Sequence, residues 1–113
     1  MESLQSILSE YLKTNKIVHE PARFAILELL ALNGKMDYSS IKEVLGLSDG
    51  NLHNHLSKLE RKGYIKVRKG FRLRRPRTEY TITEEGLKTL VDYLDKTIKT
   101  LETLEAKLKS IRT

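Results

Sequence analysis

The 113-residue sequence contains no cysteine, and no stretch approaches the roughly 20 consecutive apolar residues of a membrane-spanning helix. The lack of cysteine excludes disulfides, thiolate metal sites and thiol nucleophiles. The first ten residues carry no basic segment followed by an apolar block, so we expect no secretory signal and a cytoplasmic location. At this length we expect a single domain over residues 1–113, too small for a catalytic domain plus a regulatory one.

Residue patterns that carry catalysis are also lacking. His53 and His55 stand two positions apart in a predicted helix, so they point in different directions and cannot bind one metal ion together, and His19 is distant in sequence. The glycines form no phosphate-loop pattern, and no serine or carboxylate pair has a catalytic context. We therefore expect no enzyme activity, no metal and no cofactor, and we expect His55 to be a packed residue.

The positive charge is concentrated in one segment. The chain has 21 Lys and Arg against 15 Asp and Glu, for a net charge of +6. Residues 58–77 hold ten basic residues and one acid, a local charge of +9, so the rest of the chain is slightly acidic. Such a block favours a polyanionic partner; the alternative is a solvated face, which normally mixes both signs. The basic residues of this block are not arranged along an amphipathic helix with bulky apolar anchors, which argues against binding to a membrane surface.

The spacing of apolar residues predicts four helices before residue 63, over residues 1–15, 21–33, 40–45 and 48–62. A short extended piece at 36–38 precedes the third helix. Ser40 and Glu43 have the spacing of a capping box, and Ser48 suits the cap of the fourth helix. Because only a short turn at Gly46 separates the third and fourth helices, they form a predicted helix-turn-helix.

After residue 63 the apolar period changes from 3.6 to 2, which predicts a β-hairpin with strands near 65–68 and 79–83. Its predicted loop, residues 69–78, holds most of the positive block, with Gly70 and Pro76 shaping it. We expect Arg74 and Arg75 at its tip.

A last helix is predicted from its cap, Thr83, to Arg112, about 45 Å at 1.5 Å per residue. This exceeds the size of a compact globule, so the distal half projects with its leucine seam exposed, and such a seam needs a partner. We expect a homodimer built from both terminal helices, with interface residues Leu4, Leu8, Tyr11, Leu94, Ile98, Leu101, Leu104, Leu108 and Ile111. In the alternative, the seam folds back on helix 1–15 of the same chain.

The order of these elements resembles that of small winged-helix transcriptional regulators related to the MarR and ArsR types, especially a compact version common in archaea. The resemblance covers about residues 18–94 and is carried by EPARFAILELL (20–30), GLSDGNLHNHLSKLE (46–60), KGYIKV (62–67) and RTEYTITEEG (77–86). It implies a mainly α fold with a small β-hairpin: a winged helix-turn-helix core (18–82), a wing (about 66–80) and a long C-terminal dimerisation helix (83–112). It also implies a homodimeric regulator that binds double-stranded DNA; whether it senses an effector stays open.

The fourth helix is the predicted recognition helix, because a major groove about 12 Å wide accepts one helix and its N-terminal side chains reach base edges. With Leu52, Leu56 and Leu59 facing inward, the outward candidates besides Asp49 are Ser48, Asn51, His53, Asn54, Ser57 and Lys58. Related regulators often have arginine where Asn54 stands, which indicates a different base preference.

The predicted wing supplies long cations for phosphates or a narrow minor groove: Arg68, Lys69, Arg72, Arg74, Arg75 and Arg77. Ser39 and Ser40 stand at a helix start and are candidates for phosphate contacts, with plain capping as the alternative. Arg23 either approaches a phosphate or makes an internal ion pair. The competing function is a winged helix that binds RNA or a protein through its basic surface.

Overall fold

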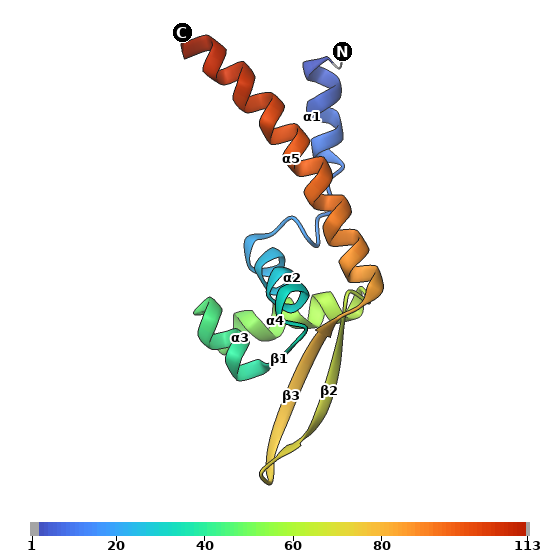
Figure 1. Cartoon of the computed structure of the whole chain (residues 1–113), viewed down its shortest axis with the longest axis vertical. Coiled ribbons are helices and arrows are strands. Elements are labelled where there is room, and N and C mark those ends of the chain that lie inside the picture. The colour runs from blue at the N-terminus through green and yellow to red at the C-terminus, as the bar shows by residue number, and fades with distance from the viewer. Residues whose placement is uncertain (1–2, 113) are drawn as a thin grey trace.

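The computed structural model describes residues 3–112 and contains five helices and one three-stranded antiparallel sheet (Figure 1). The elements follow one another as α1 (Leu4–Leu12), α2 (Pro21–Asn33), β1 (Lys35–Asp37), α3 (Tyr38–Leu45), α4 (Asp49–Arg61), β2 (Ile65–Arg72), β3 (Arg75–Ile82) and α5 (Glu84–Arg112). The predicted fold class, a mainly α winged helix-turn-helix with a long C-terminal helix, is confirmed. The predicted start of the first helix at Met1 lies outside the described residues.

Several helix ends follow from local side-chain chemistry. The Ser48 hydroxyl accepts a hydrogen bond from the backbone N–H of Asn51 at 3.2 Å and begins α4. The Thr83 hydroxyl accepts one from the N–H of Gly86 at 2.9 Å and begins α5. Gly46 ends α3 with a left-handed φ of 65°. These three predicted boundaries are confirmed.

The predicted capping box of Ser40 and Glu43 is wrong. α3 begins earlier, and its N-cap is Asp37, whose carboxylate accepts a hydrogen bond from the backbone N–H of Ser40 at 2.8 Å. Asp and Ser are both strong N-cap residues, and here the acid at the end of β1 takes the position. Ser40 therefore lies within the first turn of the helix.

The wing is a longer ribbon than predicted. β2 and β3 pair without interruption from Ile65 and Ile82 to Arg72 and Arg75, which leaves a two-residue turn. The predicted loop at 69–78 is therefore wrong, and Gly70 and Pro76 lie within the strands. The outer ribbon has no buried face, so its sequence lacks the apolar alternation that marks a half-buried strand.

β1 adds a third strand that the sequence did not reveal as part of the sheet. It pairs antiparallel with β3, with Met36 opposite Tyr80 and Asp37 opposite Glu79, so the strand order is β1-β3-β2. This pairing joins the segment between α2 and α3 to the base of the wing.

The core lies between α2, the inner face of α4, the base of the sheet and the first turns of α5. The predicted inward positions Leu52, Leu56 and Leu59 are buried, as are the α2 residues Ile26, Leu27 and Leu30. At the start of α5, Gly86 lies so close to the residue that precedes β2 that an added Cβ would be 2.1 Å from the carbonyl oxygen of Tyr64. The helix packs flush against this backbone because residue 86 has no side chain.

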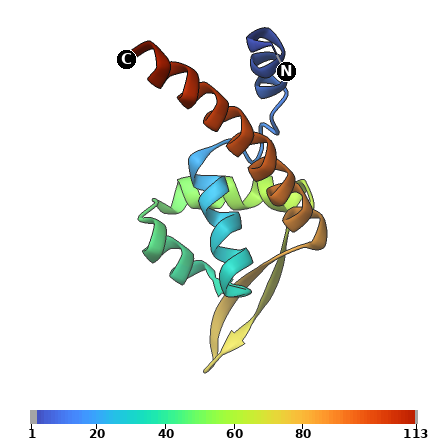
Figure 2. The ribbon, with the colours of Figure 1, turned by 45° about the horizontal axis from the view of Figure 1, so that its top comes forward.

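The molecule is elongated, with extents of 62 × 27 × 22 Å and a radius of gyration of 17.4 Å, against about 13 Å for a compact chain of this size. The distal part of α5 leaves the core on one side together with α1, and the wing leaves it on the other (Figures 1 and 2). Leu90 is buried in the core, whereas Leu101 and Leu108 on the distal part are exposed. The two protruding parts are therefore the candidates for binding partners.

Candidate nucleic-acid interface

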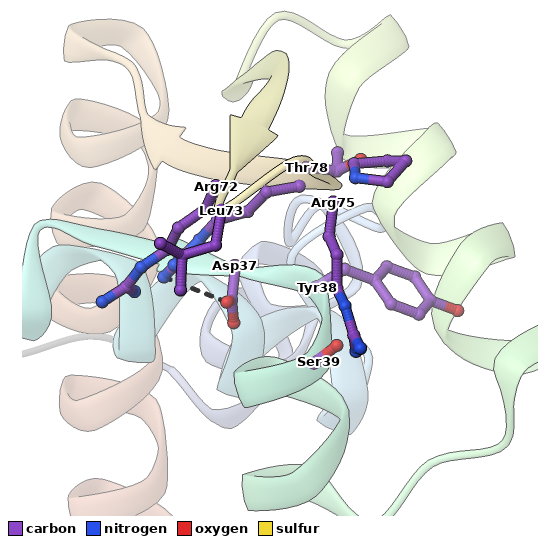
Figure 3. Close-up of a pocket in the computed structure, with 9 residues that line it drawn as sticks. Asp37, Tyr38, Ser39, Arg72, Leu73, Arg75 and Thr78 are labelled. Carbon is purple, nitrogen blue, oxygen red and sulfur yellow. Dashed lines mark ion pairs between the residues drawn. The ribbon is translucent and has the colours of Figure 1, made fainter.

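The wing, the first turn of α3 and the first turn of α4 form one continuous surface. A hollow of about 730 Å³ lies between α3 and the wing (Figure 3), and a second hollow lies between α3 and α4. Tyr38 and Ser39 line both hollows, so they connect the wing to the start of the predicted recognition helix. Tyr38 was not among the predicted site residues; its only signal in the sequence was its place beside Ser39 and Ser40.

α4 presents its predicted polar face to solvent. Its inward leucines are buried, and five of the six predicted contact residues are exposed: Ser48, Asn51, His53, Asn54 and Lys58. Ser57 is half-buried. Lys58 lies near the C-terminal end of α4 and lines a separate hollow with Ile17 and Arg23, so it is not brought together with the residues near α3.

The N-terminal end of α4 carries an acid whose charge is balanced within the fold. Oδ1 of Asp49 lies 3.0 Å from Nζ of Lys42 and accepts a hydrogen bond from the Tyr38 hydroxyl at 3.1 Å. The hydrogen bond from Lys42, followed by that from Tyr38, lowers the pKa of the Asp49 carboxyl. Burial, followed by the bond to Asp49, raises the pKa of the Tyr38 hydroxyl. This cluster holds Tyr38 and Lys42 of α3 against Asp49, the first residue of α4.

The wing cations comprise five exposed residues and one residue that forms an ion pair within the fold. Arg68, Lys69, Arg72, Arg74 and Arg75 are exposed, as expected for phosphate contacts. Arg77 is different, because its guanidinium lies 3.1 Å from Oδ2 of Asp37 and its side chain is largely covered. Figure 3 shows Arg72 and Arg75 on the same hollow as Asp37. Arg77 thus holds the wing to α3, and the outer arginines carry exposed positive charge.

The two predicted serines differ in their surroundings. Ser39 is exposed and lines both hollows, whereas Ser40 is half-buried and its backbone N–H bonds to Asp37. Hydrogen bonding from Ser40, and then the charges of Arg77 and Arg72, lower the pKa of the Asp37 carboxyl. Of the two serines, Ser39 has the geometry for an added contact.

Arg23 makes the internal interaction that was one of its two predicted roles. It is buried, its Nε donates to the carbonyl oxygen of Ile17 at 2.7 Å, and its Nη1 lies 3.8 Å from the Glu20 carboxylate. The same Nη1 lies 3.1 Å from Nδ1 of His55 on α4. His55 is therefore a packed residue, as expected, and this cluster ties α4 to the segment before α2.

The predicted dimer residues divide into some that are half-buried within this chain and others that are exposed. α1 lies against α5 of the same chain, with Ile7 and Thr100 buried, so part of the fold-back alternative is present. Leu94 is half-buried against the core, and Leu104 and Tyr11 are also half-buried. The other six predicted residues are exposed: Leu4, Leu8, Ile98, Leu101, Leu108 and Ile111.

A side-chain bridge that the sequence analysis missed joins α1 to α5. The Tyr11 hydroxyl lies 3.3 Å from Nε2 of His19, and Nδ1 of His19 lies 2.8 Å from the Tyr93 hydroxyl. These three residues are 8 and 74 positions apart, so no local pattern marks the bridge. It sets the direction of α1 relative to α5.

Metal-binding and membrane-spanning features are absent from the described part of the chain. Within residues 3–112, no group of three or more His, Asp or Glu side chains has the arrangement of a metal site. None of the helices in this range combines the length and apolar character needed to cross a membrane.

The family described as winged helix DNA-binding domain matches residues 22–104, which include α2, the sheet, the helix-turn-helix and most of α5. The chain belongs to this winged-helix family. The match covers most of the predicted core (18–82), and it extends along the projecting helix beyond the region of the predicted resemblance.

Individual proteins agree with this assignment. The winged-helix chain is 32% identical over 90 residues to an uncharacterized protein of Methanocaldococcus jannaschii, a match covering 80% of this chain and 98% of that protein. It is similar to a transcriptional regulator homologue from Pyrococcus horikoshii, with a TM-score of 0.79, 34% identity and coverage of 87% and 96% of the two chains.

A bacterial regulator shares the fold at lower identity. The PcaV transcriptional regulator from Streptomyces coelicolor, solved in complex with its natural ligand, has a TM-score of 0.66 and 20% identity. The similarity covers 83% of this winged-helix chain and 65% of that one. The predicted resemblance to winged-helix transcriptional regulators is confirmed.

Proposed function

We propose that this winged-helix protein is a sequence-specific, double-stranded DNA-binding transcriptional regulator that acts as a homodimer. The observation that carries the proposal is the shared surface of α4 and the wing. The polar face of α4 and five wing cations are exposed. Arg72 and Arg75 of the wing share one hollow with the first turn of α3, and the start of α4 shares a second hollow with the same turn. A base-reading helix beside a phosphate-binding ribbon is the combination that specific duplex recognition needs.

The two parts of this surface have different roles in the proposal. Asn51 and Asn54 read adenine edges in the major groove, and His53 contacts a base or a phosphate. Arg72, Arg74 and Arg75 bind flanking phosphates or enter the minor groove, which adds affinity without reading the major-groove sequence. Ser39, which lies between the wing and the start of α4, contacts a phosphate of the same duplex. The role is binding alone, with no catalysis and no cofactor.

The homodimer is proposed from the apolar residues left exposed beside the α1–α5 contact. Leu4 and Leu8 on α1 and Leu101 and Leu108 on α5 are exposed although α1 already covers Thr100. A second copy related by a two-fold axis covers the same residues on both chains, because such an interface is self-complementary. In that arrangement two α4 helices enter successive major grooves about 34 Å apart.

Gel shifts with the DNA upstream of the protein's own gene test this function against RNA or protein binding. The control duplex has the same composition in scrambled order, and a structured RNA is the third probe. We expect the upstream duplex to bind at least about 100-fold more tightly than the scrambled duplex at physiological salt. Equal affinity for both duplexes across salt concentrations, or tighter binding of the RNA, would contradict the proposal.

A further inference from the structure

The turn of the wing has an unfavourable backbone conformation for its residues. Leu73 and Arg74 have φ values of 51° and 66°, and within residues 3–112 they are the only non-glycine residues with positive φ. A two-residue hairpin turn with both φ values positive strongly prefers Asn-Gly or a similar pair, because side chains with a bulky Cβ crowd the backbone there. A leucine at this position therefore disfavours the turn that it occupies.

The side chain of Leu73 does not compensate through packing. It is 90% exposed, the highest exposure among the large apolar residues of the described chain. Phe71, which lies on β2 two residues before Leu73, is 79% exposed. It is opposite Pro76 of β3, which is also exposed. The end of the wing thus presents apolar side chains that are largely exposed to solvent.

The residues around this apolar tip indicate what it binds. Arg72, Arg74 and Arg75 flank Leu73, and all three are exposed. The ribbon carries Leu73 about 20 Å beyond Val67, the last residue of β2 that packs on the core, at about 3.3 Å per residue. Three exposed arginines favour a polyanionic partner, and the apolar side chain among them favours an apolar slot in that partner. A duplex offers both, since its phosphates line a groove whose base steps open to apolar side chains.

We propose that Leu73 is an apolar wedge that enters the minor groove beside the sequence read by α4 and partly unstacks one base step. The inference rests on the proposed DNA-binding function. The arginines hold the tip of the wing on the DNA backbone, and insertion of Leu73 bends the duplex away from the wing. Pyrimidine–purine steps unstack most readily, so the wedge adds a preference for such a step at a position that α4 does not touch.

The substitution Leu73→Asn separates this role from folding. Asn tolerates left-handed φ better than Leu, so we expect the variant to unfold at a higher temperature than the wild-type protein. The substitution also removes the apolar side chain that forms the proposed wedge. With the upstream duplex carrying 2-aminopurine at the flanking step, wild-type protein raises the fluorescence, and Leu73→Asn leaves it near the free-duplex value.

The affinity measurement adds a second criterion. We expect Leu73→Asn to bind the upstream duplex about tenfold more weakly, a loss comparable to that of one base contact. The slope of log K against log salt stays unchanged, because no charge is removed. Leu73→Met keeps a long apolar side chain and retains the fluorescence change. The control Leu32→Asn alters a similarly exposed leucine on α2, away from the wing, and leaves fluorescence and affinity unchanged.

The outcomes that overturn the inference differ from those that overturn the function. Wild-type protein that binds the duplex without a fluorescence change refutes the wedge and leaves DNA recognition intact. Leu73→Asn with wild-type affinity and fluorescence also refutes it, and weaker transcriptional control by that variant would then assign the tip to a protein partner. Failure of the wild-type protein to bind any duplex overturns both the function and the wedge.

Discussion

The guanidinium of Arg77 lies 3.1 Å from the carboxylate of Asp37, and the same carboxylate accepts the backbone N–H of Ser40 at 2.8 Å. One acid therefore caps α3 and also anchors the base of the wing. Because Asp37 also pairs with Glu79 in the β1–β3 register, it lies where strand, helix and wing meet. Asp37 therefore connects the base of the wing to the start of α3.

Asp37 makes stability depend on pH at the acid end. Hydrogen bonding from Ser40 and the charge of Arg77 lower its folded pKa below the unfolded value of about 3.9. Its stabilisation is therefore present above about pH 4 and is lost as the pH falls through the lower folded pKa. Asp37→Ala should cost about 1–2 kcal/mol at pH 7, measured by urea unfolding, because it removes both the cap and the ion pair.

Asp37→Asn is the matched control, since Asn is an equally good N-cap but carries no charge. We expect it to cost less than about 1 kcal/mol at pH 7 and to flatten the acid dependence between pH 5 and 3. Equal destabilisation by both variants would show that the cap contributes nothing.

Arg23→Ala should be strongly destabilising. The guanidinium is buried and serves the carbonyl of Ile17, the Glu20 carboxylate and His55 together. Removing it leaves buried polar groups without partners, at a cost of about 3–5 kcal/mol in the free energy of unfolding. Arg68→Ala, on the exposed wing, should change stability by less than about 0.5 kcal/mol. A similar small effect for Arg23→Ala would contradict the structural role.

Two glycines offer a second matched pair. Gly86→Ala places a methyl group 2.1 Å from the Tyr64 carbonyl, so the start of α5 must shift, and we expect a loss of at least about 2 kcal/mol. Gly50→Ala lies in α4 with no atom within 4 Å of the new Cβ, and it should stabilise by up to about 1 kcal/mol. Thermal unfolding compares the two; the reverse order would contradict the close packing of α5.

Wing and recognition helix should differ in their effects on DNA binding. Arg74→Ala with Arg75→Ala weakens binding to every duplex and reduces the salt slope by about 0.9 for each phosphate that the wing no longer neutralises. Asn54→Ala leaves the slope unchanged and alters sequence preference. Fluorescence anisotropy at several salt concentrations measures both. If the phenotypes were exchanged, the division between positioning and reading residues would be wrong.

The proposed dimer predicts an effect of charge on the distal part of α5. Leu101 and Leu108 are 53% and 63% exposed, so replacing both with Glu costs little within one chain. In a dimer the same change buries like charges at the interface, and sedimentation equilibrium should show monomers. Leu32→Glu, on α2, should leave the dimer intact. A double variant that remains dimeric would remove this face from the interface.

The parts of the fold that depend on residues close together in the sequence were predictable. Ser48, Gly46 and Thr83 act within one helical turn, and the leucines of α4 repeat at helical spacing. Asp37 shows the limit of such reasoning, because two good caps stood three positions apart and pairing of β1 with β3 favours the earlier one.

The outer wing and the buried clusters were not predictable for physical reasons. A ribbon exposed on both faces leaves no hydrophobic period, so its strands read as a loop. Arg77 was predicted to contact DNA, and Arg23 was predicted either to approach a phosphate or to make an internal ion pair. Their partners Glu20, His55 and Asp37 are apparent only after folding. The exposed positions of α4 were predictable because the buried leucines identify the opposite face.

Selection of bound sequences from a random duplex pool tests the central claim most directly. A homodimer that reads DNA through α4 should enrich a two-fold symmetric site whose half-sites are centred about 10 base pairs apart, one helical turn. The wings add a preference for flexible steps beside it. A pool that stays random after repeated selection, or an enriched site without symmetry, would contradict dimeric, sequence-specific recognition.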